Sequence, residues 1–132
     1  MKRSLYKHHG FTLIELLVVL AIITSLMMLA APRYFASIDH AKEVTLRQNI
    51  SILRETIDKY YGDTGQYPES LQQLVDKRYL RTLPVDPVTE RTDSWIIMAP
   101  PPDANGKTNG KVYDVRSGAP GKTAAGVPYE SI

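Results

Sequence analysis

The first half of the chain carries two hydrophobic patterns in succession. The first is a run from Phe11 to Ala31 in which Glu15 is the only formally charged residue. At a rise of about 1.5 Å per residue, a helix over this run spans about 31 Å, close to the roughly 30 Å hydrocarbon core of a bilayer. We therefore predict a transmembrane helix over residues 11–31.

The second pattern lies beyond Pro32, where apolar residues recur every three or four positions. Such spacing is typical of an amphipathic helix whose apolar stripe faces a small core. The stripe consists of Leu46, Ile50, Leu53, Ile57 and Tyr60. The residues between them, Arg54 included, are predicted to form a solvated face of mixed charge. Gly62 suits a helix C-cap and opens a GDTG turn, so we predict that this helical half covers residues 32–61 and ends before Gly62.

Pro32 lies where the two patterns meet. A proline inside a helix removes one backbone hydrogen bond and clashes with the preceding turn, so we predict a helix kink at Pro32. The alternative is two separate helices joined by a turn. Residues 33–41 lack the Gly, Asn or Ser-rich composition of a loop, which favours one continuous helix.

The pattern of residues 62–132 predicts a small α+β domain. Pro68 can open a short helix over SLQQLVDKRYL, with apolar residues at helical spacing. Farther on, two β-rich runs, SWIIMA and KVYDVRS, predict an antiparallel hairpin from about Trp95 to Arg116 with a long Gly/Asn-rich connection. The predicted fold class is therefore α+β, a long N-terminal helix with a short helix and a hairpin packed on its outer half.

Composition narrows the possible functions. A chain of 132 residues has room for one modest domain and one membrane segment. The formal charge of +2 is dispersed, so no nucleic-acid partner is expected. The absence of cysteine excludes disulfides, thiolate zinc sites and thiol nucleophiles. His40 lacks a third ligand at metal spacing, and no side chain lies in a recognisable catalytic setting, so we predict that the protein is not an enzyme.

Basic residues before the apolar run indicate its orientation. Lys2, Arg3 and Lys7 precede the run, and the positive-inside rule keeps such residues in the cytoplasm. A cleaved secretory signal peptide is the alternative. Its apolar region is only about 7–15 residues long, and Pro32 directly after a pair of alanines makes a poor cleavage site.

The residues at the start of the apolar run resemble a known family. A basic leader followed by Gly10-Phe11-Thr12-Leu13-Ile14-Glu15 and a membrane span resembles the class III signal of type IV pilins and type II secretion pseudopilins. Residues 59–87, KYYGDTGQYPESLQQLVDKRYLRTLPVDP, resemble the G-type, or major, pseudopilin, in which a Tyr-Pro turn, a short helix and an LPxDP loop follow the long helix. Adhesive type IV pilins usually carry a C-terminal cysteine pair, which this chain lacks.

The resemblance implies a processing pathway, a location and partners. A prepilin peptidase would cut between Gly10 and Phe11, removing residues 1–10 as a cytoplasmic leader, and Phe11 would then be N-methylated. The protein would reside in the bacterial inner membrane with its C-terminal domain in the periplasm. Implied partners are further copies of the chain, the prepilin peptidase/methyltransferase, minor pseudopilins, the inner-membrane assembly platform and lipid.

The implied function is that of a structural subunit polymerising into a short periplasmic pseudopilus that drives type II secretion. The alternative is a cysteine-free minor pilin of a type IV pilus. Both readings imply a pilin-like fold.

Glu15 stands one helical turn after Phe11. A lone acid at the bilayer centre costs about 2.5–3.5 kcal/mol on insertion scales, so Glu15 must lie near the interface or be paired. A free α-amine, with an unperturbed pKa of about 7.7–8, is a natural partner on the same chain or on a neighbour. The resemblance implies the neighbour, which makes Glu15 an assembly residue. The alternative is an interfacial glutamate without a partner.

The C-terminal tail departs from the family pattern. G-type pseudopilins usually end in an acidic calcium-binding loop, whereas the tail here, SGAPGKTAAGVPYESI, contains a single acid, Glu130. Asp114 and Glu130 remain as candidate ligands, and we expect no cofactor. The family also commonly continues LPxDP with Trp-Gly, where this chain has Val88-Thr89.

Overall fold

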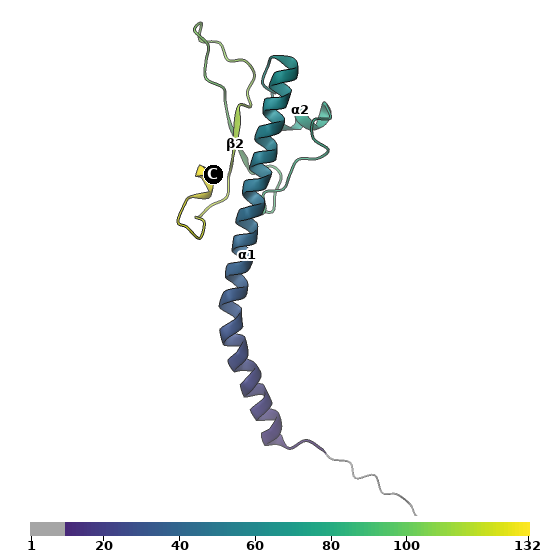
Figure 1. Ribbon diagram of the computed structural model, residues 1–132, viewed down its shortest axis with the longest axis vertical. Helices are drawn as coiled ribbons and strands as arrows, with labels where there is room; N and C mark the ends of the chain where they lie inside the picture. The colour runs from purple at the N-terminus through teal and green to yellow at the C-terminus, as the bar shows by residue number, and fades with distance from the viewer. Residues whose placement is uncertain (1–9) are drawn as a thin grey trace, which may run out of the picture. The chain divides into compact units, whose positions relative to one another are not determined.

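The computed structural model describes residues 10–132 (Figure 1). Their elements in chain order are α1 (Leu13–Thr64), α2 (Leu71–Asp76), β1 (Trp95–Met98), β2 (Asp114–Ser117) and a 3-10 turn, η1 (Tyr129–Ser131). This is the predicted α+β fold class, with a long N-terminal helix, a short helix and an antiparallel two-stranded sheet. The predictions for Lys2, Arg3, Lys7 and most of the leader lie outside the described residues.

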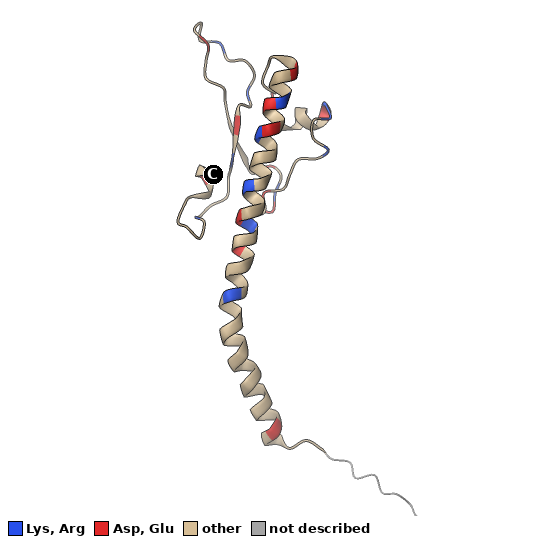
Figure 2. Cartoon of the chain, viewed as in Figure 1, with Lys and Arg blue, Asp and Glu red and all other residues tan. Residues whose placement is uncertain are grey.

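Helix α1 is continuous over 52 residues and contains Pro32 in its interior. The alternative of two helices separated by a turn is therefore wrong, while the kink at Pro32 stays a prediction. Figure 2 shows a stretch of this helix without charged residues, which the sequence places between Glu15 and Arg33. By length and composition α1 can cross a membrane, and the side chains of its apolar part are exposed.

The end of α1 corrects one expectation. The helix does not stop before Gly62 but continues to Thr64. Gly65 has a φ of 73°, and its N–H donates to the Tyr61 carbonyl at 2.8 Å. A helix C-cap of this kind needs both a positive φ and a hydrogen bond back to the last turn. The second glycine of the GDTG turn meets both requirements, so Gly62 remains helical.

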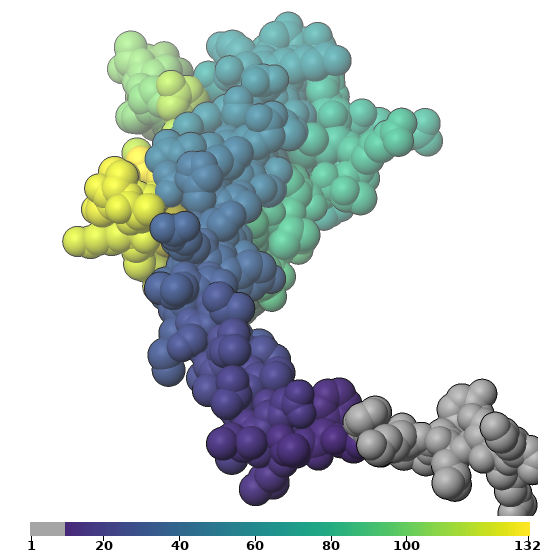
Figure 3. All heavy atoms as spheres, turned by 60° about the horizontal axis from the view of Figure 1, so that its bottom comes forward, coloured from purple at the N-terminus to yellow at the C-terminus, as the bar shows by residue number. Residues whose placement is uncertain are grey.

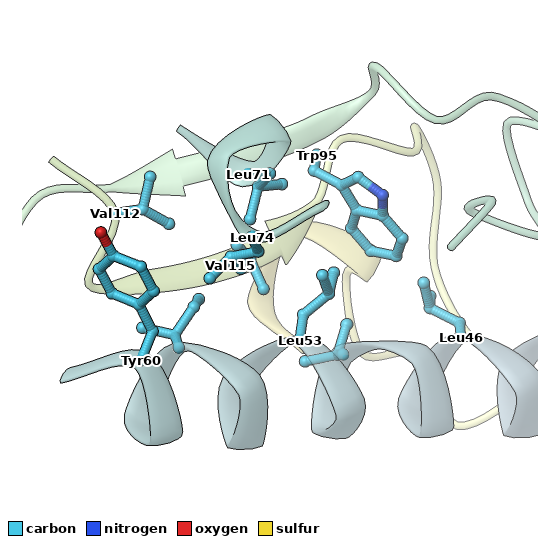
Figure 4. Close-up of a cluster of buried hydrophobic side chains, with 10 residues drawn as sticks. Leu46, Leu53, Tyr60, Leu71, Leu74, Trp95, Val112 and Val115 are labelled. Atoms are coloured by element: carbon cyan, nitrogen blue, oxygen red, sulfur yellow. The ribbon is translucent and has the colours of Figure 1, made fainter. Parts of the chain in front are cut away.

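The core lies within the compact unit formed by Ile38–Ile132 (Figure 4). All five residues of the predicted stripe on α1 are buried. Across from them lie Leu71 and Leu74 of α2, Trp95 of β1, and Val112 and Val115. Each fully buried aliphatic side chain contributes about 1.5–3 kcal/mol, so this stripe is what attaches the small elements to α1.

Helix α2 begins later than predicted. It starts at Leu71, with Ser70 as the N-cap, whose Oγ accepts the Gln73 N–H at 3.2 Å. Pro68 does not open the helix. Its carbonyl instead accepts the N–H groups of Lys111 and Val112, at 3.1 and 2.9 Å. The long hairpin connection therefore engages Pro68, and the serine hydroxyl sets the helix start.

The sheet is the predicted hairpin, one residue longer than expected. Strands β1 and β2 are antiparallel, with Trp95 opposite Ser117 and Met98 opposite Asp114. The loop before the sheet is held by Asp86, which is fully buried. Its carboxylate accepts the N–H groups of Val88 and Thr89 and the hydroxyl of Ser117, the last at 2.5 Å. The aspartate of the LPxDP loop thus connects this loop to β2.

Candidate functional site

The residues of the predicted cleavage site precede α1. Gly10, Phe11 and Thr12 are not helical, and Phe11 is 89% exposed. A Cβ added at Gly10 would meet no atom within 4 Å, so packing within the described chain does not require a glycine there. An exposed, non-helical peptide is what a protease cleft can bind in extended form. The structure therefore leaves the Gly10–Phe11 bond accessible, and its cleavage and the methylation of Phe11 stay predictions.

Thr12 and Glu15 form a reciprocal capping box at the start of α1. The Thr12 Oγ1 accepts the Glu15 N–H at 3.2 Å, and Glu15 Oε2 accepts the Thr12 N–H at 3.4 Å. The Thr12 carbonyl also accepts the Leu16 N–H at 3.3 Å, which makes Thr12 the N-cap. Sequence reasoning overlooked this arrangement, although a threonine followed three residues later by glutamate is its usual signal.

The capping box gives Glu15 a local electrostatic role. Its carboxylate lies in the first turn of α1, where the partial positive charge of the helix N-terminus stabilises an anion by about 0.3–1 kcal/mol. The hydrogen bond to Thr12 keeps this carboxylate near the residue that follows Phe11. The site therefore presents an anion beside the backbone position where cleavage would create a free amine. Pairing between the two groups stays a prediction.

The candidate calcium ligands lie in a different part of the chain, within the unit Ile38–Ile132. The Asp114 carboxylate is bonded to the guanidinium of Arg54, with Nε to Oδ1 at 2.6 Å. Glu130 lies in η1 and is exposed. Arg54, expected on the solvated face, instead has a half-exposed side chain that reaches β2. No local pattern marks this contact, because 60 residues separate the two partners.

Comparisons with known proteins agree with the start signal and the apolar run of α1. A prokaryotic N-terminal methylation motif matches residues 5–31. The chain is 34% identical over 94 residues to type II secretion system core protein G of Pseudomonas aeruginosa, an alignment that covers 59% of this chain and 66% of the relative. The chain thus spans just under two thirds of that protein. No solved structure matches the chain.

Two further relatives extend the comparison. Competence protein ComGC of Halalkalibacterium halodurans is 28% identical over 80 residues, covering 61% of this chain and 78% of the relative. Type II secretion system core protein G of Escherichia coli is 30% identical over 101 residues, covering 64% of this chain and 70% of the relative. With the methylation motif at its start and this extent of similarity beyond it, the chain belongs to the family of type II secretion system core protein G, the G-type pseudopilins.

Proposed function

We propose that this protein is a pseudopilin subunit that polymerises from the bacterial inner membrane into a short periplasmic filament, and that this filament drives type II secretion. The observation that carries the proposal is the start of α1, where an exposed Phe11 is followed by the Thr12–Glu15 capping box. The family membership and the methylation motif support the same function.

Membrane anchoring follows from the apolar part of α1. Its side chains are exposed in the isolated chain, and such a surface is stable in lipid but not in water. Orientation follows from the basic residues of the leader, which favour a cytoplasmic N-terminus. The unit Ile38–Ile132, with its polar loops, is then periplasmic.

Assembly requires a new partner for Glu15. Cleavage after Gly10 creates an amine on Phe11, next to the residue whose N–H Glu15 already accepts. In the filament, Glu15 of an incoming subunit neutralises the Phe11 amine of a subunit already incorporated, and this pairing sets the axial stagger. Both charges lie in a medium of low dielectric, where removing one partner costs about 3–5 kcal/mol because the other stays unpaired.

Several partners follow from this function. A prepilin peptidase/methyltransferase processes Gly10 and Phe11 at the cytoplasmic face. Minor pseudopilins and an inner-membrane assembly platform receive the processed subunit, and further copies of the chain extend the filament. We infer these partners from the family to which the chain belongs. The residues proposed to contact them lie at the start of α1.

Substitution of Glu15 tests the proposal. Glu15→Leu removes a charge from the span, so membrane insertion and leader cleavage are expected to remain normal or to improve. Filament formation and secretion are expected to be lost, because every subunit contact then leaves an amine unpaired. Glu15→Asp, whose charge survives on a shorter side chain, should be intermediate. Fractionation, immunoblots of the cleaved form and electron microscopy of overexpressed filaments measure these steps separately.

Thr24→Val is the matched control, because among residues 10–132 the Thr24 hydroxyl bonds only to the Leu20 carbonyl of its own helix, at 2.8 Å. This variant makes the span more apolar and leaves Glu15 unchanged, so it should assemble normally. Wild-type filament yield from Glu15→Leu would refute the pairing.

A second candidate, a cysteine-free minor pilin of a type IV pilus, is equally compatible with the start signal, because the resemblance is to pilins and pseudopilins alike. Deletion of the gene distinguishes the two. Loss of secreted proteins from the medium with intact surface pili supports the secretion function, whereas loss of pili with normal secretion supports the pilus.

A further inference from the structure

The guanidinium of Arg54 joins α1 to β2 and to the C-terminal segment, residues 120–132. Its Nε and Nη2 donate to the two carboxylate oxygens of Asp114, at 2.6 and 3.4 Å. Nη2 also donates to the backbone oxygens of Val115 and Ile132, both at 3.3 Å. In the space-filling view the C-terminal segment, in yellow, lies against α1 (Figure 3). One side chain thus connects parts of the chain that are 60 to 78 positions apart.

The C-terminal segment has few other attachments. Its remaining hydrogen bonds are internal, such as the Tyr129 N–H to the Gly121 carbonyl and the Thr123 N–H to the Val127 carbonyl. Within residues 10–132, Arg54 provides the one hydrogen bond between this segment and another element. The segment is also held by packing, since Tyr129 and Ile132 contact the core and Thr123 is buried.

The oxygen atoms around Arg54 do not make a suitable set of ligands for a calcium ion. Ca²⁺ takes about six to eight oxygen ligands, several of them charged. Here both oxygens of Asp114 already bind a guanidinium, and the tail supplies one further carboxylate, that of Glu130. Over the described part of the chain, no three His, Asp or Glu side chains gather as a metal-binding group. A calcium ion at Asp114 would also be repelled by the positive charge of Arg54.

We propose that Arg54 is the built-in cation of this domain and holds residues 120–132 against α1 and β2 in place of a bound calcium ion. A guanidinium suits this role because its planar fork can bind a carboxylate with two N–H groups and still donate to carbonyls. The C-terminal segment is therefore ordered without a divalent ion. This inference is independent of filament assembly.

The test uses the full-length chain in detergent micelles, with millimolar Ca²⁺ or with EGTA. Hydrogen exchange of peptides from residues 120–132 and thermal unfolding followed by Trp95 fluorescence are measured. The wild type should show the same exchange and the same midpoint in both buffers. Arg54→Met should raise exchange in this segment by about tenfold, as expected for loss of hydrogen bonds to a charged group. Arg54→Lys keeps the charge but loses the fork, so its exchange should be intermediate.

Lys42→Met is the matched control, because Lys42 is also a basic residue of α1 but pairs with Glu90, at 3.6 Å, outside the C-terminal segment. Its tail exchange should equal that of the wild type. A wild-type midpoint that rises by many degrees in Ca²⁺ and falls again in EGTA would overturn the proposal. Wild-type exchange in Arg54→Met, or in Arg54→Lys if the methionine variant does not fold, would overturn it as well.

Discussion

Thr12 and Glu15 each accept the other's backbone N–H at the start of α1. This reciprocity gives Glu15 a hydrogen-bond partner before any second subunit is present. A carboxylate that is partly satisfied on its own helix is less costly to hold at a membrane interface than a free one. The residue proposed to drive assembly is therefore also part of the local structure of the helix start.

Thr12→Val tests this local role. Valine has the shape of threonine but no hydroxyl, so the Glu15 N–H loses its acceptor and the helix start is destabilised by about 1 kcal/mol. We expect cleaved subunit at near wild-type levels and fewer filaments, with a smaller loss than for Glu15→Leu. Quantitative immunoblots of the membrane and sheared-filament fractions measure both. Thr12→Ser retains the hydroxyl and should behave as wild type; equal filament loss in both variants would contradict the capping role.

The polar groups of Asp86 all take part in hydrogen bonds. Asp86→Ala would leave two N–H groups and the Ser117 hydroxyl without their acceptor inside the core, at a cost of about 2–5 kcal/mol. Asp86→Asn retains one carbonyl oxygen for the N–H groups and should cost much less. Trp95, the single tryptophan, pairs with Ser117 across the sheet and reports unfolding in denaturant. Wild-type stability of Asp86→Ala would show that these hydrogen bonds matter little.

At the scale of elements, α1 is the scaffold on which the small elements pack. Five positions of its stripe, spaced three or four apart, contact α2, β1 and β2 through one cluster of apolar side chains. The two ends of the helix are set by side-chain and backbone chemistry, the capping box at Thr12 and the left-handed glycine at Gly65. Between them the apolar pattern changes from a lipid-facing run to a core-facing stripe without a break in the helix.

Two glycines near the end of α1 should respond in opposite ways to alanine. Gly62 is helical and has open space for a Cβ, so Gly62→Ala should stabilise the helix by up to about 1 kcal/mol. Gly65 has a φ of 73°, where a Cβ is strained, so Gly65→Ala should destabilise by about 1–2 kcal/mol. Denaturant unfolding of the two variants against wild type measures both signs. Destabilisation by Gly62→Ala with no effect of Gly65→Ala would return the cap to Gly62.

At the scale of the whole molecule, the proposed cleavage after Gly10 would change the charge of the chain. Loss of residues 1–10 removes Lys2, Arg3 and Lys7, so the formal side-chain charge falls from +2 to −1. The amine that this cleavage would create on Phe11 would add a single positive group. Under the proposed function, one step would thus remove the charge that favours a cytoplasmic N-terminus and create the amine with which Glu15 is proposed to pair.

The intact mass of the protein extracted from membranes tests the proposed cleavage after Gly10 and the methylation of Phe11. We expect a chain that begins at Phe11 and carries one additional methyl group. A strain without the prepilin peptidase should yield the full-length chain and no filaments. Retention of Met1 in protein that still supports secretion would contradict the processing pathway.

The sequence alone determined the features that depend on local periodicity. The apolar run, the stripe from Leu46 to Tyr60 and the hairpin after Trp95 were all predictable, because helix and strand geometry repeat over a few residues. The start signal around Gly10 and Glu15 was likewise visible, because its residues are contiguous. Its capping box is equally local, because Thr12 and Glu15 stand three residues apart.

The tertiary structure decided what depends on distant parts of the chain. Which glycine caps α1, and whether Pro68 or Ser70 begins α2, depended on where neighbouring backbone groups lie in the fold. The contact of Arg54 with Asp114 joins residues 60 positions apart, and a charged residue on a helix face has the same local pattern whether it meets water or a strand. Tertiary packing brings such partners together, so no short stretch of the sequence includes both of them.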